Sequence, residues 1–144
     1  MVRTKNPCTP YNYYRLLQSV RTGDAWQEWV LFMLDGIEQT SHQTIVLIQG
    51  IKELMLQHKH RLRDELPKIY SQDLINNLFR HPYTKIEFVM SELQVHRNTA
   101  VKYLEELVKI GLLSKHKIGK ENLYLNDALF EMLTNVSSRT GTGT

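Results

Sequence analysis

Residues 104–113 read LEELVKIGLL and join two kinds of pattern. Upstream, residues 96–110 carry apolar side chains at helical spacing, which predicts an amphipathic helix. Gly111 follows, a residue suited to the left-handed position that ends many helices. Residues 114–125 then read as a strand, a turn and a second strand. The stretch therefore predicts a helix that leads into a β-hairpin.

Two shorter apolar segments precede this helix. Residues 73–79 predict one helix, and residues 85–93 predict another, with Thr84 placed to cap it. A last short helix is expected from Asn126 or Asp127. Three short helices followed by a two-stranded hairpin are the parts of a winged helix-turn-helix domain.

The longest pattern lies in the first half of the chain, where residues 25–60 repeat apolar side chains at spacings of four and three. Such a helix would be about 50 Å long, whereas a compact chain of this size has a radius of gyration of about 14–15 Å. We therefore expect the helix to protrude and to need a partner. Thr40 and Thr44 within the repeat favour a mixed helix–helix surface over a dedicated coiled coil. The predicted docking or dimer seam consists of Trp26, Val30, Met33, Ile37, Leu47, Ile51 and Leu54.

The predicted fold class is mainly α, with a helical hairpin that includes the long helix, followed by a winged helix-turn-helix. Pro67 ends the charged continuation of the long helix and is the expected domain boundary. The expected organisation is a flexible arm over 1–10, a helical segment over 11–66, a winged-helix domain over 67–133 and a disordered tail over 134–144.

Composition excludes several classes of protein. The chain has 144 residues, 42% of them hydrophobic, which suits one domain or two small ones. One cysteine, Cys8, cannot form an intramolecular disulfide and fits a cytoplasmic protein. No apolar run approaches 18 residues, so no membrane association is expected.

Positive charge is concentrated in the predicted third helix and wing. Residues 96–120 contain six lysines and arginines against two acidic residues, and this local excess of four exceeds the net charge of +3 of the whole chain. This concentration favours contact with double-stranded DNA. Glu105 and Glu106 on the same helix leave open a protein-binding winged helix instead. The predicted DNA-binding residues are His96, Arg97, Asn98, Thr99, Lys102, Lys115, Lys117 and Lys120.

Other candidate sites have simpler interpretations. His58 and His60 are two residues apart, so their side chains diverge on a helix and no metal site is expected. A solvated helix end is the simpler reading of this pair. Tyr11, Tyr13, Tyr14, Trp26 and Trp29 are expected to form a core between the first helix and the long helix. No glycine-rich phosphate loop is present, so no cofactor is expected.

Four short stretches resemble the segment that follows the catalytic core of bacterial Fic-family proteins. They are YYRLL at 13–17, WQEWVLFML at 26–34, LPKIY at 66–70 and LFRHPYTKI at 78–86. The resemblance covers about residues 11–133. It implies a helical segment that leads into a C-terminal winged helix, in a family that transfers AMP from ATP to a protein hydroxyl.

The catalytic signature of that family is not found in this sequence. His81-Pro82-Tyr83 begins like it, but Thr84-Lys85-Ile86 follows, with no glycine and no Asn-Gly-Arg. The resemblance therefore implies a non-catalytic C-terminal module rather than an enzyme. Two functions remain open at this stage: DNA binding through the third helix and wing, or interaction through the long helix, either in a homodimer or by docking on a Fic catalytic core.

Overall fold

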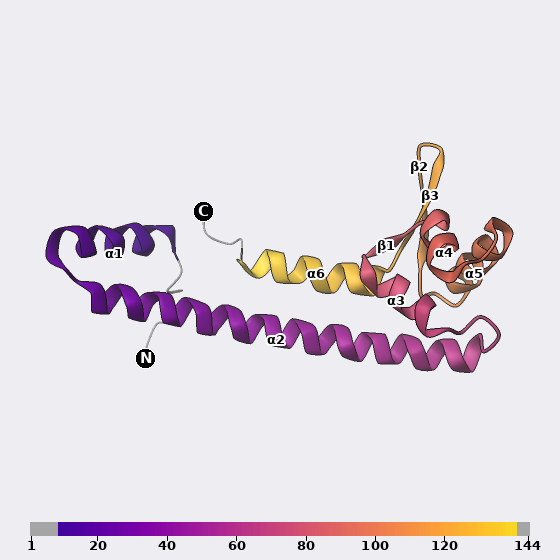
Figure 1. Cartoon of the computed structure of the whole chain (residues 1–144), viewed down its shortest axis with the longest axis horizontal. Helices are drawn as coiled ribbons and strands as arrows, with labels where there is room; N and C mark the ends of the chain where they lie inside the picture. Colours follow the sequence, from indigo (N-terminus) through magenta and orange to yellow (C-terminus); the bar gives the residue numbers. More distant parts are fainter. Residues whose placement is uncertain (1–8, 141–144) are drawn as a thin grey trace. The chain divides into compact units, whose positions relative to one another are not determined.

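The structure is a computed structural model that describes residues 9–140 of the chain. Within this range, helices account for most residues and three short strands form one sheet. The predicted fold class is confirmed, including the long helix and the winged helix-turn-helix. In chain order the elements are α1 (Pro10–Gly23), α2 (Trp26–Glu65), α3 (Gln72–Arg80), β1 (Tyr83–Thr84), α4 (Ile86–Leu93), α5 (Arg97–Lys109), β2 (Ser114–Ile118), β3 (Glu121–Leu125) and α6 (Asp127–Thr140) (Figure 1).

The chain forms two compact units that divide inside α2 rather than at Pro67. Unit 1 contains α1 and α2 as far as Ile48, and unit 2 runs from Gln49 to Arg139. The expected boundary differs because the second half of α2 buries side chains among the later helices. Leu62, for example, is fully buried in the core that α3 and α5 share. Pro67 follows the end of α2 but does not separate the units.

Unit 1 is held together by a small aromatic cluster. The Tyr13 and Trp29 ring centroids lie 5.1 Å apart in an edge-on arrangement, and Trp29 stacks on Phe32 at 6.2 Å. The larger aromatic core predicted from the sequence is wrong in part, because Tyr11, Tyr14 and Trp26 are 75%, 69% and 57% exposed. Leu16 is the buried side chain of α1. Helix α1 thus covers only one side of this stretch of α2.

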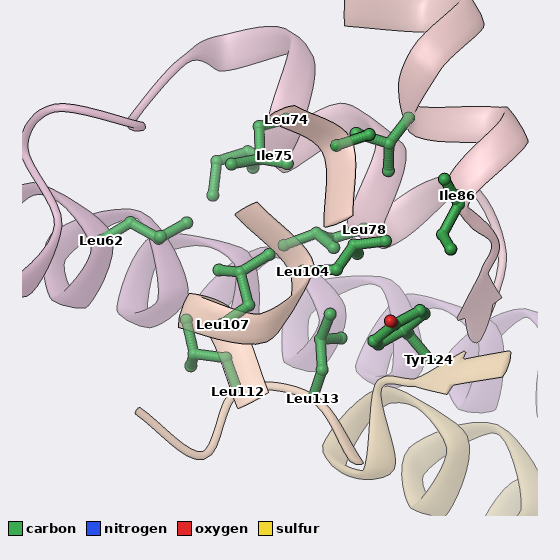
Figure 2. Close-up of a cluster of buried hydrophobic side chains, with 12 residues drawn as sticks. Leu62, Leu74, Ile75, Leu78, Ile86, Leu104, Leu107, Leu112, Leu113 and Tyr124 are labelled. Atoms are coloured by element: carbon green, nitrogen blue, oxygen red, sulfur yellow. The ribbon is translucent and has the colours of Figure 1, made fainter. Parts of the chain in front are cut away.

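Unit 2 contains the main hydrophobic core. Side chains from α2, α3, α4, α5 and β3 converge in one cluster, and Figure 2 shows the leucines of α3 and α5 and the ring of Tyr124 among its members. Each helix contributes from one face, as the apolar spacing in the sequence predicts. The residues that define this core are Leu62, Leu74, Ile75, Leu78, Ile86, Val89, Ala100, Leu104, Leu107, Leu112, Leu113 and Tyr124.

The wing belongs to a three-stranded antiparallel sheet in the order β1-β3-β2, whereas the sequence predicts two strands. The added strand is Tyr83–Thr84, which pairs with Leu125 and Tyr124 of β3. Thr84 therefore does not cap α4, whose N-cap residue is Lys85. The short strand ties the segment before α4 to the base of the wing.

Helix α6 replaces most of the tail that was expected to be disordered. It begins at Asp127 and continues to Thr140. Asn126 caps it, because Asn126 Oδ1 accepts a hydrogen bond from the Leu129 amide at 3.2 Å. Within unit 2 it lies against α2, because a Cβ added at Gly50 would stand 3.7 Å from Met132. The prediction of disorder over 134–144 is thus wrong as far as residue 140. Residues 141–144 lie outside the described range, as do residues 1–8 of the expected arm.

His58 differs from the solvated helix end expected for it. Only 6% of the residue is exposed, and its ring meets Phe79 of α3 edge-on at 5.3 Å. No described residue forms a hydrogen bond with its Nδ1 atom. Burial lowers the pKa of His58, and the nearby positive charge of Arg61 lowers it further. The folded chain therefore favours the neutral imidazole.

This burial predicts a pH-dependent stability. Because the folded-state pKa of His58 lies below its unfolded value of 6.5, its contribution is complete above pH 6.5 and is lost as the pH falls through that value towards the folded pKa. We expect the free energy of unfolding to fall by up to about 1.4 kcal/mol per pH unit in that window. His58→Leu should remove this dependence, and His60→Leu at the exposed neighbour should keep it. Urea unfolding of the three proteins at pH 7.5 and 5.5 tests this. If the unfolding free energy of His58→Leu changed with pH as much as that of the wild type, the prediction would be contradicted.

Candidate nucleic-acid interface

The turn between α4 and α5 sets the orientation of α5. Gln94 ends α4 in the left-handed region at φ 54°, and its backbone N–H donates to the Met90 carbonyl. His96 is extended and occupies the N-cap position of α5, but its side chain makes no capping hydrogen bond. The first turn of α5 therefore starts at an exposed end, with His96, Arg97 and Asn98 all exposed. This arrangement suits the insertion of a helix N-terminus into a groove.

The side chains predicted on α5 differ in how free they are. Arg97 Nη1 lies 3.4 Å from Glu87 Oε1 of α4, and both side chains are more than 60% exposed. Asn98 and Lys102 are exposed and form no side-chain hydrogen bond or ion pair with any residue from 9 to 140. Thr99 is half-buried and offers less of its side chain to solvent. Asn98 and Lys102 lie four residues apart, hence on one face of α5.

The hairpin of β2 and β3 carries the other predicted contacts. Ser114 to Ile118 pair in register with Leu125 to Glu121, and Gly119 takes φ +61° in the turn. Lys117 and Lys120 are exposed, and neither has an ion-pair partner within the described chain. The wing therefore presents two free ammonium groups at its outer end.

Lys115 does not share this freedom. Its Nζ lies 2.5 Å from Glu105 Oε1 of α5 and 5.8 Å from the ring centroid of Tyr124. The hydrogen bond with Glu105 raises the pKa of Lys115, and the same bond lowers the pKa of Glu105. The Tyr124 hydroxyl also donates to Glu105 at 3.3 Å, and burial raises the pKa of this tyrosine. This lysine braces the wing against α5.

Two further ion pairs involve acidic residues outside the predicted site. Lys85, before α4, forms an ion pair of 2.5 Å with Glu121 of β3, and Glu87 of α4 faces Arg97. The hydrogen bond from Lys85 lowers the pKa of the Glu121 carboxyl. The sequence gives no spacing signal for the first pair, whose partners are 36 residues apart. These contacts link α4 to α5 and the residue before α4 to the wing.

Ion pairing determines which cations of residues 96–120 remain free to contact a ligand. Within residues 96–120, Lys109 and Lys115 pair with Glu106 and Glu105, and Arg97 pairs weakly with Glu87. The cations of this region without an ion-pair partner in the described chain are Lys102, Lys117 and Lys120. The basic surface is therefore three lysines, one on α5 and two on the wing.

The seven seam residues of α2 do not share one environment. Trp26, Val30, Met33 and Ile37 are exposed and belong to unit 1. Leu47 and Ile51 are half-buried, and Leu54 is buried within unit 2. The exposed seam is thus limited to the first part of the helix. No helix in the described range is long and apolar enough to cross a membrane, and no cluster of metal-binding side chains occurs among residues 9–140.

Comparison with known families matches residues 54–129 to the protein adenylyltransferase SoFic-like family, C-terminal domain. The match covers just over half of the chain, from the second half of α2 to the first residues of α6. The chain belongs to this family. The resemblance to the C-terminal region of Fic-family proteins is therefore confirmed over the matched residues, which include the stretches at 66–70 and 78–86. As a SoFic-like C-terminal domain, the matched region corresponds to the part of an adenylyltransferase outside its catalytic core, and α1 with the first half of α2 lies before it.

Proposed function

We propose that unit 2 binds double-stranded DNA, with the N-terminal turns of α5 in the major groove and the wing against the phosphate backbone. The observation that carries this proposal is the exposed group of Asn98 and Lys102 on α5, together with the free Lys117 and Lys120 on the wing. A positioned helix N-terminus with adjacent free cations is the arrangement that winged-helix proteins use to read DNA.

The proposed contacts divide by chemistry. Arg97 can hold the O6 and N7 atoms of guanine, and Asn98 can hold adenine through its amide. The exposed pair between Arg97 and Glu87 is worth about 0–1 kcal/mol, so a guanine edge can replace the carboxylate. Lys102, Lys117 and Lys120 contact phosphates, which supply affinity without sequence information. Lys115 is excluded from this set because Glu105 already holds it.

This division predicts the salt dependence of binding. Each neutralised phosphate lowers log K by about 0.9 per decade of salt concentration, so three lysines give a slope of about −3. A surface of this size suits a module that works beside other DNA contacts or in more than one copy. A slope close to zero in the wild-type chain would argue for the protein-binding alternative.

Charge reversal at Lys102 tests the proposal. Lys102→Glu should weaken binding to a labelled 20-base-pair duplex at least tenfold at 50 mM salt, because it removes one phosphate contact and adds a repulsive charge. The matched control is Lys52→Glu, which makes the same charge change at an exposed position of α2. Fluorescence anisotropy measures both. Absence of wild-type binding at 50 mM salt, or equal losses in the two variants, would overturn DNA binding by this surface.

A further inference from the structure

The first part of α2 presents an apolar face that nothing in unit 1 covers. Six large side chains define it, and each is between 41% and 59% exposed: Trp26, Val30, Met33, Leu34, Ile37 and Ile48. Monomeric proteins rarely expose contiguous apolar surface of more than a few hundred Å². We refer to these six residues as the apolar face of α2. It lies outside the family match, which begins at residue 54.

The width of this surface identifies the kind of partner. At 100° per residue, the apolar face spans about 100° of the helix, and the exposed Leu31 and Ile45 widen it to about 160°. A two-stranded coiled coil uses a narrower stripe of a and d positions. Thr40 and Thr44 within the repeat donate their hydroxyls to carbonyls of their own helix at 2.8 Å, and they place small polar side chains where a coiled coil has large apolar ones. A folded domain covers such a surface better than a single helix does.

The positions of charged residues on α2 also favour a folded domain as the partner. Glu28 and Asp35 lie on the opposite side of α2 from the apolar face, by the same helical spacing. The pair of His42 and Glu38 is exposed at the margin of the surface. Depletion of charge from the centre of a surface is typical of permanent interfaces, which resemble a protein core divided between two partners.

We propose that the apolar face of α2 docks on the catalytic domain of a SoFic-like protein adenylyltransferase. The family that matches the chain is described as the C-terminal domain of such an enzyme, so a catalytic domain accompanies it there. The uncovered face lies in the residues that come immediately before the matched region. A separate catalytic domain meets this face through the same contacts as one joined to it, and a typical interface of this kind buries about 800 Å² on each partner.

The test uses the full 144-residue chain and a SoFic-like catalytic domain expressed without its C-terminal domain and without the helices that precede that domain. Isothermal titration calorimetry should show a 1:1 complex with a Kd below about 10 µM and a negative heat-capacity change, the signature of apolar burial. Ile37→Asp should weaken the complex at least tenfold because it places a charge in the centre of the interface. Gln43→Asp, an exposed change on the other side of α2, should stay within twofold of the wild type.

Sedimentation of the chain alone and with the catalytic domain separates the remaining outcomes. A monomer that converts to a 1:1 complex supports the proposal, provided that circular dichroism shows unchanged helix content in Ile37→Asp. A homodimer that persists at 1 µM with excess catalytic domain, and that Ile37→Asp dissociates, would make a second copy the occupant and overturn it. A monomer that does not bind the catalytic domain would also overturn it.

Discussion

Replacement of Leu104 by alanine is expected to destabilise unit 2 by about 3 kcal/mol, within the usual range for a leucine truncated in a closed core. Leu104 is fully buried and belongs to the cluster that includes Leu78 and Tyr124. The loss combines the transfer free energy of the missing methyl groups with the cavity that they leave. Since α5 carries the proposed DNA contacts on its other face, a loosened α5 should also bind DNA more weakly.

Native-state hydrogen exchange of the α5 amides measures this change. Both tryptophans, Trp26 and Trp29, lie in unit 1, so tryptophan fluorescence does not report on unit 2 directly. Leu56→Ala is the matched control, because Leu56 of α2 is 46% exposed and its truncation should lose less than about 1 kcal/mol. Equal losses for Leu104 and Leu56 would mean that Leu104 does not lie in a closed core.

The elements that the sequence predicts well are those whose signals are local. Apolar spacing within 96–110 corresponds to α5, and Gly111 takes the expected left-handed conformation at φ +73°. Asn126, one of the two expected caps of the last helix, does cap it. In each case the residues that determine the structure lie within one or two turns of one another, so a single stretch contains the whole signal.

Features that depend on distant partners do not follow from local patterns. Strand β1 has two residues, too few for alternation, and it exists because β3 pairs with it some 40 positions later. The polar end of α6 remains helical although its composition suggested disorder. Propagation of an existing helix adds one hydrogen bond for each residue fixed, and this requires no apolar side chain.

In the candidate site, too, local features follow from the sequence and contacts with distant residues do not. The sequence locates Lys102, Lys117 and Lys120 and counts their charge correctly, but it cannot show which neighbouring cations are already paired. Lys115 is held by Glu105 across ten positions of the chain. A sum of charges over residues 96–120 already subtracts Glu105, but it does not show which cation that carboxylate holds, and it omits Glu87, which pairs with Arg97 from outside the window. Three cations therefore remain unpaired within the described chain, one fewer than the local excess of four. His58 is the corresponding case for burial, since the helix that presents it is evident from the sequence and the Phe79 ring that covers it is not.

A chain of polar side chains links α3, β1 and α4, and its members Asn77 and Thr84 are buried. Asn77 of α3 is 4% exposed. The Thr84 hydroxyl donates to Asn77 Oδ1 at 2.8 Å, and Asn77 Nδ2 donates to Glu92 Oε2 at 2.9 Å. Arg80 forms an ion pair with the other oxygen of Glu92 at 2.5 Å. Every polar group of the Asn77 side chain thus has a partner, as a buried amide requires.

Asn77→Leu is expected to destabilise unit 2 by about 2 kcal/mol, because the Thr84 hydroxyl, 2% exposed, would be left buried without an acceptor. Thr84→Val should cost a similar amount by leaving Asn77 Oδ1 unpaired. The double variant should lose clearly less than the sum of the two, since it removes both partners and leaves apolar groups in their place. Hydrogen exchange of the α3 and α4 amides measures the four proteins of this cycle. Additive losses would show that the Thr84 hydroxyl and the Asn77 amide do not depend on each other, and would contradict this prediction.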